Sequence, residues 1–255
     1  MSPIDPQGGR GWPPSGLWLA VRFLSRLPTP DPGTVDHERI AASLAWYPVV
    51  GLLLGGLLAG LAWVTAALGG GPLLTAGLVL LAWVGLTGAL HLDGLADMAD
   101  AWVGGQGDRE RTLAILKDMA IGPVGVAVVV AILLLKFAGV AETGALALLL
   151  ALVIGRMVPA LLFLTTPYVR PGGLGDATRT APRLPVLFGL GLAVLFILAM
   201  APLAGLLALV VAAGVLLLLR AWMVRRLGGI TGDTIGASME VTEAVVLVVL
   251  ALFLI

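Results

Sequence analysis

The chain has 255 residues, of which 59% are hydrophobic and only 12% are charged, and its 15 basic residues balance its 15 acidic ones. Soluble domains are about 45–50% apolar and about 25% charged. The composition therefore excludes an ordinary soluble globule, a disordered chain and a nucleic-acid-binding protein with a basic face. The absence of cysteine also excludes disulfides, thiolate nucleophiles and thiolate metal sites.

The first helical pattern lies close to the N-terminus. Leu17, Val21 and Leu24 recur at helical spacing, whereas Arg22 and Arg26 lie on the other side of the same helix. This pattern is typical of a helix in the membrane interface, and two prolines end it. We expect an interfacial segment over residues 1–40, rather than a signal peptide or a first spanning helix.

Seven stretches of mostly apolar residues follow, each of about the length that crosses a bilayer. They are 41–68, 72–91, 120–140, 143–164, 184–201, 202–219 and 234–255. We therefore expect an all-α, polytopic membrane helix bundle with about seven transmembrane helices, forming a single domain over residues 1–255.

The charges are unevenly distributed between the connections. Nearly all of the basic residues fall in the N-terminal segment and in the loops 92–119, 165–183 and 220–236, which seven spans place on one side. Positively charged loops stay in the cytoplasm. We expect these loops to form an active site on the cytoplasmic side of the cytoplasmic (inner) membrane, with Lys136 on the opposite face.

The densest polar chemistry is the run HLDGLADMAD at residues 91–100. Asp93, Asp97 and Asp100 are spaced by four and three, so they share one face of a helix and repel one another. Mg²⁺ would remove this repulsion, because it prefers carboxylate oxygens and commonly also binds substrate phosphates. The alternative is a solvated acidic face. His91 is a ligand, a hydrogen-bonding neighbour or an ordinary interfacial histidine.

Lys117 and Asp118 come just before the third apolar stretch. A lysine acts as a point charge on phosphate, and Asp118 would complete the metal shell. The alternative is an ordinary charged pair at the head of a spanning helix.

Two glycine-rich segments carry further polar groups. Arg170 precedes Gly173 in RPGGLG, which suits a lid over a phosphorylated substrate. Gly232 lies in GGITGD, where backbone N–H groups near a helix N-terminus can bind an anion. For Arg179 and Arg183, which follow in the same loop 165–183, the alternative is that they are ordinary cytoplasmic arginines.

Asp233, Glu240 and Glu243 can face one side of the last helix. The two glutamates lie inside the apolar stretch, where an ionisable group is costly and indicates a function. Pairing with Arg156, the other charge predicted inside the bilayer, is an alternative that is compatible with such a function.

Five motifs stand in order along the chain: FLSRLP, HLDGLADMADAW, R-x₅-KD-x₃-G-x₂-G from Arg111 to Gly125, RPGGLG and GGITGDTIGASMEVTE. Together they resemble the cobalamin synthase family of adenosylcobinamide-GDP ribazoletransferases. The resemblance extends over nearly the whole chain, and HLDGLAD and TGD-x₂-GA are its most specific elements. FLSRLP suggests no chemistry of its own.

The resemblance implies a Mg²⁺-dependent membrane enzyme. Its substrates would be adenosylcobinamide-GDP and α-ribazole or α-ribazole 5′-phosphate, and GMP would be released. We expect Asp93, Asp97, Asp100 and Asp118 to hold the metal. We expect Asp97, Lys117, Asp233 and Glu240 to be catalytic, and His91, Arg111, Lys117, Arg170, Gly173 and Gly232 to bind substrate.

Other classes of protein stay open at this point. One is a different membrane transferase acting on diphosphates, such as a CDP-alcohol phosphotransferase or a prenyltransferase. Another is an ion-coupled carrier that uses Glu240, Glu243 and Arg156. The lipid bilayer is an expected partner and nucleic acid is not, whereas self-association and association with other cobalamin-assembly enzymes stay open.

Overall fold

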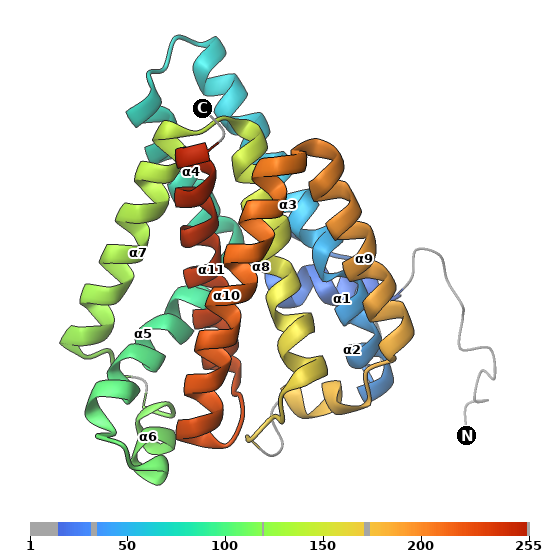
Figure 1. The fold of residues 1–255 in the computed structure, drawn as a ribbon, viewed down its shortest axis with the longest axis vertical. Helices are drawn as coiled ribbons and strands as arrows, with labels where there is room; N and C mark the ends of the chain where they lie inside the picture. The colour runs from blue at the N-terminus through green and yellow to red at the C-terminus, as the bar shows by residue number, and fades with distance from the viewer. Residues whose placement is uncertain (1–14, 32–34, 119, 171–173, 254–255) are drawn as a thin grey trace, which may run out of the picture.

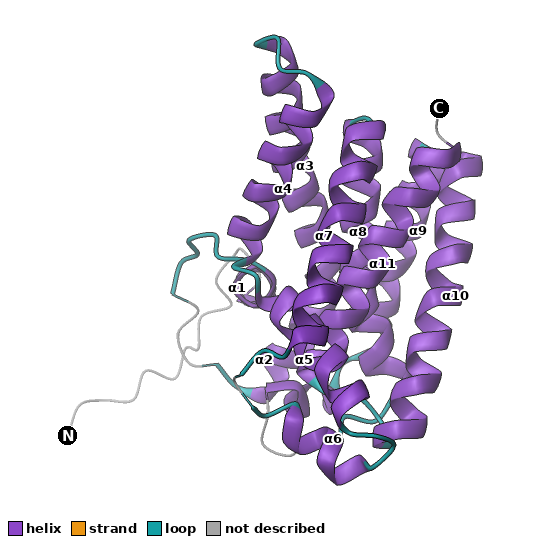
Figure 2. Ribbon diagram, turned by 90° about the vertical axis from the view of Figure 1, so that its left-hand side faces the viewer, coloured by secondary structure: helices purple, strands orange, loops and turns teal. Residues whose placement is uncertain are grey.

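The computed structural model describes residues 15–31, 35–118, 120–170 and 174–253, and the elements of these residues are helices (Figures 1 and 2). In chain order they are α1 (Ser15–Leu24), α2 (His37–Ser43), the 3₁₀ helix η1 (Leu44–Trp46), α3 (Tyr47–Ala67), α4 (Pro72–Thr87), α5 (Leu90–Gly104), α6 (Arg109–Ile115), α7 (Pro123–Glu142), α8 (Ala145–Thr165), the 3₁₀ helix η2 (Leu174–Thr180), α9 (Arg183–Met200), α10 (Pro202–Leu227) and α11 (Gly232–Phe253).

The predicted all-α membrane bundle is confirmed. Among the described residues, six helical segments are long and apolar enough to span a membrane, and the bent pair α4–α5 makes a seventh if it is counted as one span. One detail of the prediction is wrong, because the helix of the second stretch ends at Thr87. The expected helix that carries Asp93, Asp97 and Asp100 is confirmed as α5, and α6 follows it within the connection 92–119.

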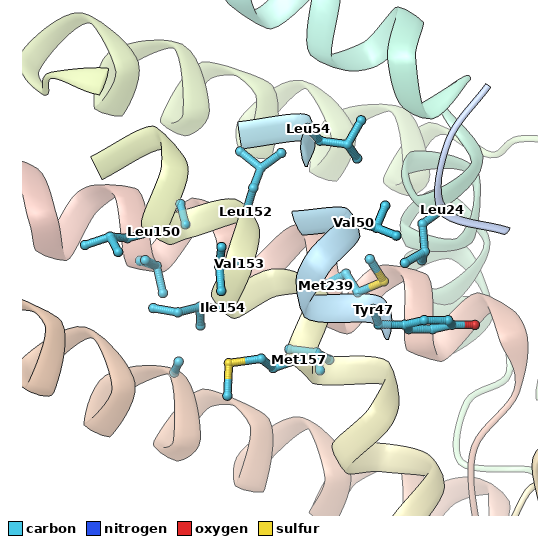
Figure 3. Close-up of a cluster of buried hydrophobic side chains, with 14 of the residues drawn as sticks. Leu24, Tyr47, Val50, Leu54, Leu150, Leu152, Val153, Ile154, Met157 and Met239 are labelled. Carbon is cyan, nitrogen blue, oxygen red and sulfur yellow. The ribbon is translucent and has the colours of Figure 1, made fainter. Parts of the chain in front are cut away.

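The core lies around α8, which packs against α3 on one side and α11 on the other. Figure 3 shows part of it, with Val50 and Leu54 of α3 beside Leu152 and Val153 of α8. Glycine allows this approach, since a Cβ added at Gly51 would stand 2.6 Å from the carbonyl oxygen of Leu152. Small residues of this kind let membrane helices come close together.

The outer helices expose their apolar side chains. Phe188 of α9, Leu203 and Leu217 of α10 and Leu134 of α7 are all more than 60% exposed. In water such a surface would be unfavourable, but hydrocarbon solvates it as well as a protein core does. These faces are therefore the lipid-facing surface of a multi-pass membrane protein.

Helix α1 has the predicted amphipathic pattern but uses it within the protein. Leu19, Val21 and Leu24 are buried, and α1 packs against α2 and α3. Arg22 and Arg26 are exposed on the other side. Its apolar stripe therefore anchors the N-terminal segment to the bundle. An amphipathic sequence pattern is the same whether the apolar side faces protein or lipid, so the pattern alone did not predict this packing.

A buried ion-pair network joins three of the spanning helices. Lys136 of α7 lies 2.6 Å from a carboxylate oxygen of Glu240 and 2.6 Å from one of Glu243, both on α11. Glu243 also pairs with Arg156 of α8, and the ammonium group of Lys136 lies 4.2 Å from the ring centroid of Trp83. The predicted pairing with Arg156 is thus confirmed, whereas the placement of Lys136 on the opposite face is wrong.

Removing the central cation should destabilise the bundle. Lys136→Met leaves two buried carboxylates with one cation, and breaking a buried pair in this way costs about 3–5 kcal/mol. We expect a clearly lower midpoint of thermal unfolding in detergent. Lys117→Met, at an exposed lysine, is the control and should unfold like the unmodified protein. Equal midpoints for the two variants would contradict the network's structural role.

Candidate active site

A sharp bend between α4 and α5 determines where the aspartate-rich helix lies. Gly88 and Ala89 both have left-handed backbone, with φ of 62° and 56°. The N-terminal segment packs on this bend, because the amide of Arg26 donates to the carbonyl of Leu86 at 2.6 Å. The bend turns α5 by 87° relative to α4. As a result, α5 crosses the lower end of the bundle in Figure 1 and meets the beginning of α11.

Two glycines allow α5 and α11 to touch. A Cβ added at Gly94 would stand 2.7 Å from the carbonyl oxygen of Asp233, and one added at Gly236 would stand 3.2 Å from the Cα of His91. Each glycine faces a polar residue of the other helix. The two most specific sequence motifs, more than 130 residues apart in the chain, therefore form one structural unit.

This contact brings acidic side chains together. The carboxylate of Asp97 interacts electrostatically with those of Asp93, Asp100 and Asp233 and with the guanidinium of Arg170. Asp93 is exposed, and Asp97 and Asp233 are partly exposed. Around Asp97, negative charge thus exceeds positive charge, in a place that solvent and a ligand can reach.

A short backbone pairing places Arg170 in this site. The amide of Val169 donates to the carbonyl of Ile230 at 2.9 Å, and the amide of Ile230 donates to the carbonyl of Pro167 at 2.9 Å. The chain after α8 is thereby tied to the chain before α11. Arg170 then reaches Asp233, with 3.3 Å between guanidinium nitrogen and carboxylate oxygen.

The N-terminus of α11 faces the same site. Thr231 and Thr234 cap it reciprocally, since the amide of Thr231 donates to the hydroxyl of Thr234 at 2.9 Å and the amide of Thr234 donates to the hydroxyl of Thr231 at 3.3 Å. Gly232 and Asp233 form the first turn. A helix N-terminus beside an arginine is a favourable environment for a phosphate.

A cavity of about 230 Å³ opens beside the acidic side chains, between the ends of α1, α5 and α11. Asp93, Asp233 and His91 contribute its polar groups, and aromatic rings such as those of Phe23 and Tyr47 line its apolar side. His91 is buried, and its Nδ1 has no hydrogen-bond partner among the described residues. The cavity can therefore receive a flat apolar group that carries polar atoms at one edge.

A family model described as Cobalamin-5-phosphate synthase matches residues 16–251 of the chain. The chain belongs to the cobalamin-5-phosphate synthase family. Curated relatives named adenosylcobinamide-GDP ribazoletransferase include one from Pseudomonas fluorescens, which is 52% identical over 246 residues, covering 93% of this chain and 99% of the relative. Those from Pseudomonas aeruginosa and Stutzerimonas stutzeri are each 51% identical, covering 92% of this chain and 97% of the relative. No solved structure is significantly similar to the chain.

Within this family member, two of the four predicted metal ligands have other contacts. Both carboxylate oxygens of Asp100 accept hydrogen bonds from the start of α7, from the amides of Gly122 at 2.7 Å and Gly125 at 2.9 Å. Asp118 is exposed and accepts a hydrogen bond from the amide of Ala120 at 3.1 Å. Asp100 thus caps a spanning helix, and Asp118 stabilises a local turn.

The remaining predicted residues are distributed as follows. Arg111 and Lys117 are exposed in and after α6. The amide of Arg111 donates to the carboxylate of Asp108, the N-cap of α6, at 2.6 Å, and in the described part of the chain no ion pair joins Arg111 or Lys117 to Asp97. Glu240 pairs with Lys136 in the core and does not line the cavity. Gly173 lies outside the described residues.

The sequence interpretation missed the aromatic wall of the cavity. Phe23 belongs to the FLSRLP motif, which suggested no chemistry by itself, and it lines the cavity because α1 packs on the bundle. Tyr47 at the start of α3 and Phe163 near the end of α8 complete the wall. The FLSRLP resemblance was the one available signal, since aromatic residues near helix ends are common in membrane proteins.

Separating α5 from α11 should damage the site. Gly94→Ala places a methyl group against the backbone of Asp233, and overpacking of this kind costs about 1–3 kcal/mol. Gly214→Ala, in α10 with no atom within 4 Å of the added Cβ, is the matched control. We expect a lower midpoint of thermal unfolding for the first variant only. An unfolding midpoint that does not change in Gly94→Ala would mean that the two helices are not in contact.

Proposed function

We propose that this protein transfers the adenosylcobinamide-phosphate part of adenosylcobinamide-GDP to α-ribazole or α-ribazole 5′-phosphate and releases GMP. The observation that carries the proposal is the contact of the HLDGLAD helix with the TGD turn, which gathers Asp93, Asp97, Asp233 and Arg170 at one end of the bundle. Membership of the family favours this reaction over a carrier or another diphosphate-using transferase.

The acidic side chains fit Mg²⁺ held jointly by protein and substrate. Among the described residues, no three His, Asp or Glu side chains form a ready-made metal cage. Mg²⁺ is commonly bound by only one or two carboxylates together with substrate phosphates. We assign this role to Asp93 and Asp97, with Asp233 beside them, and leave Asp100 and Asp118 out. When bound, Mg²⁺ would neutralise charge on the diphosphate.

Two features of the chain suit the diphosphate itself. Arg170 can donate several hydrogen bonds to phosphate oxygens, and its backbone is tied in place at Val169. The first turn of α11 at Gly232 presents backbone N–H groups and the positive end of the helix dipole. Both lie beside Asp233, so the reacting phosphate would be held between α5 and α11.

The cavity beside these groups suits the acceptor. α-Ribazole carries a flat, largely apolar base on a ribose, and the cavity pairs aromatic side chains with His91, Asp93 and Asp233. The base would lie against Phe23 and Tyr47, with the ribose hydroxyl towards the carboxylates. Such an arrangement holds the nucleophile close to the phosphorus, and positioning of this kind supplies much of the catalysis in phosphoryl transfer.

The reaction then requires one proton transfer. The ribazole hydroxyl oxygen forms a bond to the phosphorus on the cobinamide side, and the bond from this phosphorus to the bridging oxygen breaks, so that GMP leaves. Of the two aspartates that line the cavity, Asp233 is the one that we do not assign to Mg²⁺, so we propose that it accepts the hydroxyl proton while Arg170 holds its carboxylate in place. Glu240 is not needed for this role.

We place the protein in the cytoplasmic membrane with this site facing the cytoplasm. The support is the distribution of arginines, since Arg109, Arg170, Arg225 and Arg226 all belong to the end of the bundle that holds α6 and the start of α11 (Figure 1). Positively charged residues mark the cytoplasmic side of a membrane protein.

The decisive experiment is an assay of the purified protein in detergent with adenosylcobinamide-GDP and α-ribazole. We expect GMP release that depends on both substrates and on Mg²⁺, and that stops when EDTA removes the metal. Hydrolysis of adenosylcobinamide-GDP without formation of cobalamin would refute transfer to ribazole. Release of GMP at the full rate in EDTA would refute the metal assignment.

Two aspartate variants separate the metal role from the capping role. Asp97→Asn should reduce the rate more than a hundredfold, because a metal ligand contributes several kcal/mol to the transition state, while leaving the unfolding midpoint nearly unchanged. Asp100→Ala should lower the unfolding free energy by about 1–2 kcal/mol through loss of the α7 cap, with an unchanged Mg²⁺ requirement. If instead Asp100→Ala lost activity and its Mg²⁺ requirement changed, while Asp97→Asn stayed active, Asp100 would be the metal ligand.

A further inference from the structure

A second cavity lies at the same end of the bundle, outside the site described above. It measures about 360 Å³ and is lined by Trp102 of α5, Gly107, and Trp222, Arg225 and Arg226 of α10. Figure 1 shows this end of α10 beside α6. The described lining thus consists of two indole rings, two guanidinium groups and a glycine, without a carboxylate.

One wall of this cavity is fixed. The guanidinium of Arg226 lies 5.7 Å from the centroid of the Trp102 ring and donates a hydrogen bond to the Trp102 carbonyl at 2.8 Å. Its other terminal nitrogen, Nη1, is buried and has no hydrogen-bond partner among the described residues. A buried N–H that makes no hydrogen bond is costly, and this one belongs to a residue that lines the cavity.

Three of the other lining residues, Gly107, Trp222 and Arg225, are exposed. Gly107 has φ of 93°, and a Cβ built on it would stand 3.5 Å from Nη1 of Arg226. Trp222 is 54% exposed and Arg225 is exposed. The cavity therefore has one preorganised guanidinium and one free aromatic face at its mouth.

A small hydrophobic cluster lies between a residue of this cavity and the segment that carries Arg170. Ala101, Leu116 and Leu227 form this cluster, and both Trp102 and Val169 pack against it. Val169 immediately precedes Arg170, which reaches Asp233. The cavity and Arg170 therefore lie on either side of one small cluster of packed side chains.

Ordinary membrane-protein chemistry explains only part of this arrangement. Tryptophans and arginines are frequent at the cytoplasmic interface, and arginines in the last turn of α10 complement its helix dipole. Neither effect requires a cavity, nor a buried guanidinium nitrogen without a partner. Paired aromatic and arginine side chains are, however, the groups that bind a base and its phosphate, by stacking and by charge-assisted hydrogen bonds.

We propose that the cavity between Trp102 and Trp222 binds the guanine nucleotide half of the substrate and holds GMP as it leaves. The base stacks on Trp222, and its phosphate accepts hydrogen bonds from Arg225 and Arg226. This assignment rests on the proposed function, because that reaction requires the protein to bind a guanosine diphosphate group. It adds a location for the leaving group that the acidic site does not provide.

The test uses the exposed lining residues, whose loss should leave the fold intact. For Trp222→Ala and Arg225→Ala we expect the inhibition constant of GMP and the KM for adenosylcobinamide-GDP each to rise about tenfold, as for loss of one stacked base or one phosphate contact. The KM for α-ribazole should not change. Trp222→Phe keeps an aromatic face and should stay within about twofold of the unmodified protein.

Matched controls come from other parts of the chain. Trp63→Ala removes an exposed tryptophan of α3, and Arg22→Ala removes an exposed arginine of α1. Neither should change the inhibition by GMP. Unchanged GMP inhibition in both cavity variants would overturn the proposal. If these variants also lost phosphatidylglycerol that the unmodified protein retains in native mass spectrometry, the cavity would be a binding site for a lipid headgroup instead.

Direct binding keeps the test independent of turnover. Equilibrium dialysis of labelled GMP against the protein in nanodiscs should show binding that Trp222→Ala weakens about tenfold. If the unmodified protein binds GMP in this way but forms no cobalamin, the proposed reaction fails and the nucleotide site stands. If it forms cobalamin while Trp222→Ala binds GMP normally, the reaction stands and this site fails.

Discussion

The contact between α5 and α11 is the constraint on which the rest of this structure depends. It presses Asp233 against Gly94 and brings Asp93 and Asp97 alongside, although like charges at this distance repel one another. Only glycine permits so close an approach, because a methyl group at residue 94 would meet backbone that cannot move aside. The fold thus holds like charges together, at the cost of electrostatic repulsion between them.

The ion pairs deeper in the bundle hold this contact in register. Glu240 and Glu243 lie two and three turns into α11, and their partners Lys136 and Arg156 stand on the helices on either side. Sliding α11 along its axis would separate these charges in a medium that cannot solvate them. The intramembrane glutamates, which look functional in the sequence, thus form ion pairs in the same helix that carries Asp233.

The lower end of the bundle then divides into three adjoining regions. The acidic side chains and Arg170 form one region, the aromatic cavity beside Phe23 shares Asp93 and Asp233 with it, and the pocket between Trp102 and Trp222 has a separate lining. The first region suits a diphosphate, the second the acceptor base and the third the leaving nucleotide.

By itself the sequence determined the helical membrane class, the approximate spans and the polar motifs at their ends, because hydropathy and helical spacing are local properties. It also indicated that Arg170 and Asp233 belong to a site, since both stand in glycine-rich segments beside apolar stretches. Tertiary structure decided which polar group meets which. Asp100 is indistinguishable from Asp97 along the helix, yet packing turns it to the start of α7, and Lys136 enters the core because two glutamates a hundred residues away require a cation. Contacts between residues so far apart in the chain cannot be predicted from local periodicity.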